Sequence, residues 1–321
     1  MSTLKTNGIE IIGWGHYLPK RVVTTEEVNS RITLKTSSID EKVIGNVGVK
    51  KRHWSSDEET IELMSKISGE NALRNAKLKA SDIDLLLLVN WTERRYVPDL
   101  APSVANLIGA KNAMAFDLCT ACCGFATAVM TACMYLQAHD RVDNALIICT
   151  EQFSHRVRPG SKGELIVGDA SASLVLTKNT NATGGIIDFE LKNDGSLKDI
   201  VKAKMPEGWV KSKPELAQVA AELNKRAIDT IFSRNKISMQ DIDWLVPHPG
   251  TEVVHEEIKR HINCTDRKFI TNFSEVANVS SASIPLVISI NLETGKFRKG
   301  DICLCPSIGS GIYYGATLLR L

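Results

Sequence analysis

Fully apolar runs and amphipathic stretches alternate along the chain and predict alternating strands and helices. Residues 85–89 are apolar at every position, which predicts a strand covered on both faces in the middle of a largely parallel sheet. The helix before it is predicted to start at a capping box, Ser56–Glu59, and to run to about Ala76, because apolar residues recur there at helical spacing. Residues 8–18 predict another buried strand, which ends in a turn.

The second half of the chain repeats this order of elements. Pro214 predicts the start of a helix with apolar residues at helical spacing up to Ile231. The tripeptide Asp-Ile-Asp occurs at residues 82–84 and again at residues 241–243, an offset of 159 residues, each time between a predicted helix and a predicted strand. Two further pairs of predicted strands match in order: 143–148 with 301–304, and 168–176 with 309–318.

A repeat near half the chain length indicates two similar βα halves rather than a solenoid. The 321 residues suffice for two halves of about 150 residues each. We therefore expect an α/β fold built from two duplicated halves, residues 1–177 and 178–321.

The composition argues against several classes of function. A net charge of +2 gives no support for nucleic-acid binding, and the lack of any run of 18 apolar residues predicts no membrane span. Residues 1–5 do not resemble the start of a signal peptide. The eight cysteines are therefore expected to be reduced thiols in the cytoplasm.

A candidate nucleophile lies where a predicted strand leads into a helix of small and apolar residues, between Phe116 and about Leu136. Cys122 stands at the positive end of that helix, where unpaired backbone N–H groups and the helix dipole favour the reactive thiolate. Gly124 allows a tight turn and the close approach of a substrate. The alternative is that Cys122 packs as a small buried hydrophobe.

A metal site in the same stretch is not expected. Cys119 and Cys122 have the CxxC spacing of zinc ligands, but no second pair of ligands lies near them in the sequence.

The repeat predicts where the counterpart of Cys122 lies. It falls near residue 279, in a second strand-to-helix turn that contains Asn278. The strand after the second Asp-Ile-Asp ends at His248, so all three residues follow predicted strand ends, the edge at which open α/β sheets bind ligands. The alternatives are a histidine bonded to backbone and an asparagine that serves as a turn or cap residue.

Three separated motifs in this order resemble those of the thiolase-fold β-ketoacyl-ACP synthase III family. They are Phe-Asp-x3-Ala-Cys-x-Gly-Phe at 116–125, Trp-Leu-Val-Pro-His at 244–248 and Asn-x-Ser-x-Ala-Ser-Ile-Pro at 278–285, and a terminal Gly-Ser-Gly at 309–311 also fits. The resemblance covers essentially the whole chain. It implies a five-layered αβαβα architecture, with the cysteine in the first half and the histidine and asparagine in the second.

The resemblance also implies a reaction. Cys122 would take an acyl group from acyl-CoA or an acyl carrier protein, and His248 and Asn278 would hold a malonyl thioester during decarboxylation and Claisen condensation. The backbone N–H groups of Cys122 and Ser310 would form the oxyanion hole. The thioesters are substrates, no cofactor is expected, and a homodimer is implied.

Four positions depart from the family pattern. Lys42 and Asn46 stand where the family has a Trp and an Arg that clamp the adenine of coenzyme A, so a stacking platform and a bidentate donor are missing. Thr251 replaces an Asn after the histidine, and Val253 replaces an Arg used in carrier docking. These departures indicate a specialised fatty acid, polyketide or related pathway, with a donor such as an acyl group on a carrier protein.

The segment 91–98 is large and charged for a pocket mouth that, in the family, reaches the partner subunit's acyl pocket. Arg94 or Arg95 is a candidate partner for a carboxylate on the acyl chain, and Val97 a candidate pocket residue; a solvated arginine pair is the alternative. An acidic carrier protein needs a basic docking surface, for which the candidates are Lys202, Lys204, Lys211, Lys213 and Lys259-Arg260.

Three other functions remain open from sequence. An acyltransferase of the same fold would move the acyl group to oxygen or nitrogen, but it would need no enolate-stabilising Asn278. A hydroxymethylglutaryl-CoA synthase-like enzyme would need a catalytic Glu near residue 91, and Glu93 is displaced by two positions. A non-catalytic carrier-binding or dimerisation protein would leave Cys122 no more reactive than the other cysteines.

Overall fold

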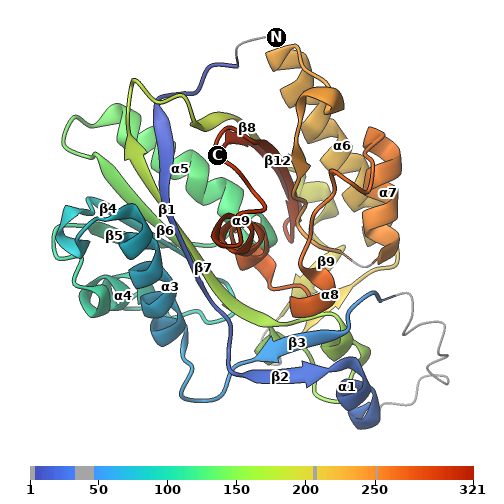
Figure 1. The fold of residues 1–321 in the computed structure, drawn as a ribbon. Coiled ribbons are helices and arrows are strands. Elements are labelled where there is room, and N and C mark those ends of the chain that lie inside the picture. Colours follow the sequence, from blue (N-terminus) through green and yellow to red (C-terminus); the bar gives the residue numbers. More distant parts are fainter. Residues whose placement is uncertain (1–3, 33–46, 205–207, 251) are drawn as a thin grey trace.

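The computed structural model describes residues 4–32, 47–204, 208–250 and 252–321. Two β-sheets lie face to face, with helices between them and on both outer sides (Figure 1).

The first sheet has the strand order β1-β7-β6-β4-β5. Its strands are β1 (Ile9–Tyr17), β4 (Leu85–Val89), β5 (Met114–Leu118), β6 (Asn144–Gln152) and β7 (Asp169–Lys178). β4 is buried at every position and runs parallel to both β5 and β6, as its apolar pattern predicts. β7 pairs antiparallel with β6 and with β1, so the sheet is mixed rather than largely parallel.

The second sheet has the order β11-β12-β13-β8. Its strands are β8 (Gly185–Asn193), β11 (Trp244–Leu245), β12 (Ile302–Gly309) and β13 (Tyr313–Arg320). Only β11 and β12 are parallel, and the other pairs are antiparallel.

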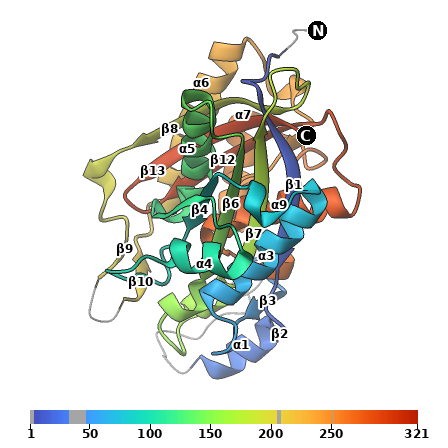
Figure 2. The ribbon, with the colours of Figure 1, turned by 90° about the vertical axis from the view of Figure 1, so that its left-hand side faces the viewer.

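The long helices divide among three layers. They are α3 (Ile61–Ala76), α4 (Leu100–Ile108), α5 (Gly124–Ala138), α6 (Leu216–Asn235), α7 (Glu252–Ile262) and α9 (Ser283–Glu293). α3 and α4 pack on the outer face of the first sheet (Figure 2), and α6 and α7 on that of the second. α5 and α9 lie between the sheets and contribute to one apolar core with strands of both. The five-layered αβαβα fold is thus confirmed.

Smaller elements complete the chain. They are α1 (Thr25–Arg31), α8 (Phe273–Val276), and the two-stranded pairs β2 (Arg21–Thr24) with β3 (Lys51–Trp54) and β9 (Val201–Ala203) with β10 (Val210–Ser212). Figure 2 shows β9 and β10 projecting beside the main sheets.

The two halves repeat at the level of single turns. The short 3-10 turns η1 (Ala80–Asp82) and η6 (Met239–Asp241) precede β4 and β11, and η2 (Ala121–Cys123) and η7 (Ser280–Ala282) precede α5 and α9. Both pairs are offset by 159 residues, as the sequence repeat predicts. The division at residues 177 and 178 falls at the end of β7 and stays a prediction.

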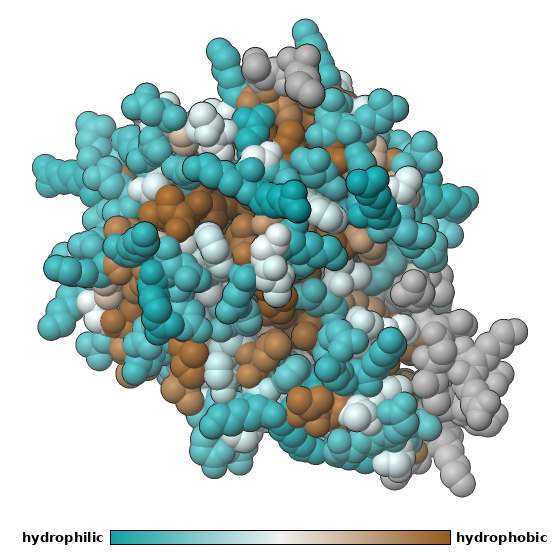
Figure 3. Space-filling view, in the orientation of Figure 1, coloured by the Kyte–Doolittle hydropathy of each residue, from teal (hydrophilic) through white to brown (hydrophobic). Residues whose placement is uncertain are grey.

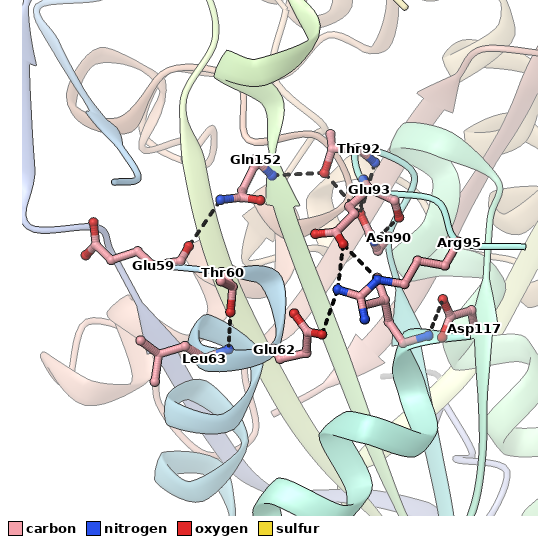
Figure 4. Close-up of polar contacts among 11 residues, drawn as sticks. Glu59, Thr60, Glu62, Leu63, Asn90, Thr92, Glu93, Arg95, Asp117 and Gln152 are labelled. Carbon is pink, nitrogen blue, oxygen red and sulfur yellow. Dashed lines mark hydrogen bonds and ion pairs between the residues drawn. The ribbon is translucent and has the colours of Figure 1, made fainter. Parts of the chain in front are cut away.

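α3 starts later than its sequence predicts. Thr60, not Ser56, is its N-cap and accepts a hydrogen bond from the Leu63 backbone N–H (Figure 4). The Glu59 carboxylate does accept from the Ser56 N–H, but it is also bound by the Tyr17 hydroxyl, at 2.5 Å, and by the Lys20 N–H. These contacts hold residues 56–59 in a turn against β1 instead of in the helix.

Among the described residues, one helical stretch, 121–138, is long enough and apolar enough to cross a membrane. However, 56% of it is buried inside the protein. Its place between two sheets explains its composition, because a core helix is apolar on all sides.

On the face drawn in Figure 3, hydrophilic side chains cover most of the rim and hydrophobic ones appear nearer the middle.

Candidate active site

The turn that carries Cys122 is tightly constrained. η2 leads directly into α5, and Ala121 has a backbone φ of +46°, a left-handed conformation that residues other than glycine rarely adopt. Gly124 has an ordinary helical φ of −58°, so its predicted freedom to turn is not used. Its small size is used, because a Cβ there would lie 2.2 Å from the Val89 Cγ1 atom.

The Cys122 sulfur is held by a residue of the second half. Its Sγ lies 3.2 Å from the Ser280 Oγ. Burial raises the pKa of the Cys122 thiol to about 12, and the Glu151 carboxylate acts in the same direction, whereas the Ser280 hydrogen bond lowers it. Burial thus outweighs the effect of the helix terminus that the sequence predicts and favours the thiol form of the Cys122 sulfur.

His248 is 6% exposed, and its backbone N–H donates to the Pro306 carbonyl of β12. Burial lowers the pKa of His248 to about 3, helped by His255 and opposed by a hydrogen bond to the Ser280 backbone. The imidazole is therefore neutral at physiological pH. Its Nδ1 is buried without a hydrogen-bond partner in the described part of the chain, which leaves a polar atom free for a ligand.

His255 supports the loop that carries His248. The Gly250 N–H donates to its Nε2 at 3.1 Å, and the ring packs edge-on against Phe269 and Phe273 at 5.3 Å each. His255 therefore helps to set the shape of the loop that carries His248.

Asn278 uses its side chain to join the loops of both candidate partners. Its Oδ1 accepts from the Ser280 N–H at 2.8 Å, and its Nδ2 donates to the carbonyl of Pro249, next to His248, at 3.3 Å. One N–H of the carboxamide makes the second bond, and the other donates to no residue that the structure describes, which leaves it available to a ligand.

Ser280 therefore links the three predicted residues: its hydroxyl contacts Cys122, its backbone N–H donates to Asn278, and its backbone lies close enough to His248 to act on the pKa of that ring. Sequence reasoning gave Ser280 no role. Its φ of +53° matches that of Ala121 exactly one repeat earlier, so the structural counterpart of Cys122 is Ser281, two residues beyond the predicted position.

Gly309, the neighbour of the predicted oxyanion residue Ser310, lies against the turn that carries Cys122. A Cβ on Gly309 would lie 3.1 Å from the Cys122 backbone nitrogen and 2.8 Å from that of Cys123, so no larger residue fits there. Ser310 follows at the end of β12, and its hydroxyl donates to the Val201 carbonyl at 2.5 Å. The end of β12 thus packs against the turn that carries Cys122.

Glu151 is a fully buried carboxyl behind the site, which sequence reasoning missed. Its Oε1 accepts from the Ser281 hydroxyl at 2.6 Å, and its Oε2 from the backbone N–H groups of Trp91 and Thr92 at 3.2 Å each. Burial raises the pKa of Glu151 to about 7 against these hydrogen bonds. The carboxyl therefore joins the Trp91 turn to the Ser280 turn.

Glu151→Gln is expected to flatten the pH dependence of stability. The folded pKa of about 7 lies above the ordinary value of 4.5, so the wild type loses stability as pH rises through this interval, by roughly 2 kcal/mol between pH 5 and pH 8. Gln is always neutral and escapes this loss. Urea unfolding of both proteins at several pH values measures the difference, and parallel curves would contradict the assignment.

Two of the charged residues in the segment 91–98, Glu93 and Arg95, are paired within the chain. In Figure 4 the Glu62 and Glu93 carboxylates converge on Arg95, with its Nη2 2.8 Å from an oxygen of each. Arg95 is thus engaged within the chain, and Glu93 is paired with it rather than offered to Cys122. Arg94 is exposed, and Val97 is 90% exposed.

The remaining sequence candidates divide into two groups. Lys42, Asn46 and Thr251 lie outside the described residues, as does the side chain of Val253. Among the basic candidates, Lys202 pairs with Asp199, Lys259 with Glu256 and Asp266, and Arg260 with Glu257, whereas Lys204, Lys211 and Lys213 are exposed.

Comparisons with known proteins identify the family of this chain. The family profile "3-Oxoacyl-[acyl-carrier-protein (ACP)] synthase III" matches residues 116–195, and its C-terminal counterpart matches residues 232–321. Proteins named beta-ketoacyl-[acyl-carrier-protein] synthase III are similar over nearly their whole length. The one from Ehrlichia canis (strain Jake) is 30% identical, with 97% of this chain and 98% of the relative covered, and one from Clostridium perfringens (strain ATCC 13124) is 32% identical, with 97% and 99% covered.

Solved structures give the same result. The 3-oxoacyl-[acyl-carrier-protein] synthase III of Aquifex aeolicus VF5 superposes with a TM-score of 0.92 at 28% identity and covers 98% of this chain and 100% of its own. Xanthomonas campestris OleA, at 19% identity and a TM-score of 0.88, shares the fold over 98% of this chain and 99% of its own. Relatives of 30% identity or more span nearly the whole chain, and the chain therefore belongs to the β-ketoacyl-[acyl-carrier-protein] synthase III family of condensing acyltransferases, as its motifs predict.

Proposed function

We propose that this protein joins an acyl group to a malonyl unit by decarboxylative Claisen condensation. The acyl group passes from an acyl thioester to the Cys122 sulfur. A malonyl thioester then loses CO2, and the resulting carbanion attacks the acyl-cysteine to form a C–C bond and release the sulfur. The observation that carries the proposal is the convergence of Cys122, His248 and Asn278 on Ser280.

His248 and Asn278 are suited to the decarboxylation step. Loss of CO2 leaves an enolate whose negative charge requires donors already in place, since buried donors that do not reorient stabilise developing charge best. The low pKa of His248 keeps its ring neutral, so the ring carries one N–H, and in the tautomer that places this proton on Nδ1, an atom without a partner among the described residues, it can donate to the enolate without placing a cation in the pocket. The free N–H of the Asn278 carboxamide supplies the second donor.

The acyl-transfer step needs an oxyanion hole, for which we propose the backbone N–H groups of Cys122 and Ser310. The tight contact between Gly309 and the Cys122 nitrogen supports this assignment, because it brings the end of β12 to the start of α5. Both steps use the chemistry of the thioesters themselves, so we propose no metal or organic cofactor.

The acyl donor is a thioester of coenzyme A or of acyl carrier protein. Lys42 and Asn46, in place of an adenine clamp, favour a carrier-bound donor and a specialised fatty acid, polyketide or related pathway. The exposed Lys204, Lys211 and Lys213 beside β9 and β10 suit an acidic carrier. The reaction would take place in the cytoplasm.

We propose that the working form is a homodimer. Tyr96 and Val97 are 97% and 90% exposed and lie next to each other at the tip of the segment 91–98. Two adjacent exposed side chains of this size suit a contact with another chain, and a second copy would place Val97 near the partner's acyl pocket.

Intact-mass spectrometry after incubation with a panel of acyl-CoA and acyl-carrier thioesters tests the function. One donor is expected to add the mass of its acyl group, and later addition of a malonyl thioester is expected to remove that mass with release of CO2 and formation of a β-keto thioester. Ester or amide products without CO2 would instead identify an acyltransferase that uses oxygen or nitrogen nucleophiles.

A further inference from the structure

Trp91, Ser280 and Cys122 form a chain of hydrogen bonds that ends at the sulfur. The Trp91 Nε1 lies 2.7 Å from the Ser280 Oγ, which lies 3.2 Å from the Cys122 Sγ. An indole N–H is a donor only, whereas a serine hydroxyl has one proton and two lone pairs. Ser280 therefore accepts from Trp91, and its own proton remains free to point at the sulfur.

The surroundings of this chain fix its direction. Ser280 is 1% exposed, so little water competes for its hydroxyl. Its backbone has a φ of +53°, a left-handed conformation that residues other than glycine rarely adopt, and this sets the direction in which the side chain leaves the backbone. Trp91 is held in turn by Glu151, through its backbone N–H, and by edge-on packing against Phe153 with ring centroids 5.3 Å apart. The hydroxyl is thus fixed from both sides before any substrate arrives.

The direction matters once the sulfur loses its proton. A thiolate can only accept hydrogen bonds, so Ser280 must then be the donor. A hydrogen bond to a charged acceptor in a buried site is about twice as strong as one between neutral groups, and it opposes the burial that raises the pKa of the thiol.

We infer that Ser280, oriented by the Trp91 indole, is a positioning residue that stabilises the Cys122 thiolate and aims it at the thioester carbonyl. The inference rests on the proposed role of Cys122 as the nucleophile. Neither residue is part of the Cys-His-Asn set, and Trp91 acts only through the serine.

The test follows alkylation of Cys122 by iodoacetamide between pH 6 and pH 11, localised to this residue by fragment-ion mass spectrometry. Ser280→Ala is expected to slow alkylation about tenfold across this pH range, because with a pKa of about 12 the sulfur is mostly protonated throughout it, and a rise of about one unit in that pKa lowers the thiolate fraction tenfold. Trp91→Phe keeps an aromatic ring against Phe153 but removes the N–H, and it is expected to shift the profile in the same direction by a smaller amount.

Ser283→Ala is the matched control. It removes a hydroxyl from the same turn that accepts from the Val279 N–H and does not contact the sulfur, so its profile should match the wild type. Ala is compatible with the backbone at residue 280, since Ala121 has nearly the same φ. Circular dichroism and the thermal midpoint verify that each variant is folded.

The outcomes separate the two proposals. Profiles of Ser280→Ala that superimpose on the wild type overturn the inference, and a shift in Ser280→Ala with none in Trp91→Phe removes the part assigned to the indole. An equal shift in Ser283→Ala shows only a disturbed turn and also overturns it. Failure of every thioester to acylate wild-type Cys122 contradicts the proposed function, whatever the alkylation profiles show.

Discussion

Replacement of Cys122 by Ala is expected to abolish the transfer of a radiolabelled acyl group from thioester to protein, a loss of more than about a thousandfold. The sulfur is the atom to which the acyl group is attached, and Ala offers no atom that can replace it. The fold should remain intact, because the change removes one atom from a half-buried side chain. Labelling is measured after denaturation, with hydroxylamine used to identify a thioester.

Cys119→Ser is the matched control for this experiment. Cys119 is an exposed thiol three residues earlier in the same segment, and it would be the more reactive sulfur if exposure alone decided. Its loss should leave labelling unchanged. Persistent labelling of Cys122→Ala at a hydroxylamine-sensitive bond would show that another cysteine carries the acyl group.

Asn278→Ala is expected to separate the two half-reactions. Acylation of Cys122 should change less than about threefold, whereas decarboxylation of the malonyl thioester should fall about 100- to 1,000-fold, the usual effect of removing one donor to a developing oxyanion. Acyl labelling measures the first step, and release of labelled CO2 from a malonyl thioester measures the second.

Asn278→Asp tests whether Asn278 donates a hydrogen bond to the developing enolate or only holds Ser280 in place. Asp keeps an oxygen that accepts from the Ser280 N–H, so the turn around Ser280 stays in place, but it has no N–H to donate to a ligand or to the Pro249 carbonyl. Decarboxylation should be lost in both variants. Full activity of Asn278→Asp would rule out the donor role, and an equal loss of acylation and decarboxylation in Asn278→Ala would mean that Asn278 acts only by holding Ser280.

The layers of the fold could be predicted because apolar pattern reports burial directly. Residues 85–89 are apolar on both faces and form a buried strand with parallel neighbours on both sides. The same pattern does not report strand direction, so the antiparallel pairing of β7 on both its sides was missed. The start of α3 was missed for a related reason: Tyr17 and Lys20, distant in sequence, bind the Glu59 carboxylate.

The candidate site was predicted in part. Repeat and motif placed Cys122, His248 and Asn278, whose chemistry is visible in their residue types. Ser280 was missed because its importance comes from a positive φ and from contacts across the two halves.

Burial is the other quantity that local sequence does not contain. Glu151 is one acidic residue among many in the sequence, and its raised pKa depends on enclosure by residues from two distant segments, around Trp91 and around Ser281. The same effect reverses the predicted ionisation of Cys122, because the helix terminus is visible in the sequence and the surrounding protein is not.

The layer formed by α5 and α9 also affects how the chain folds while it is being synthesised. Its apolar core joins residues from Ile9 to Leu319, nearly the full length of the polypeptide. While a ribosome is still synthesising the second sheet, the inner face of α5 has nothing to cover it, and such surfaces favour aggregation or capture by chaperones. The nascent protein is thereby committed to folding as one unit, whatever its origin in two similar parts.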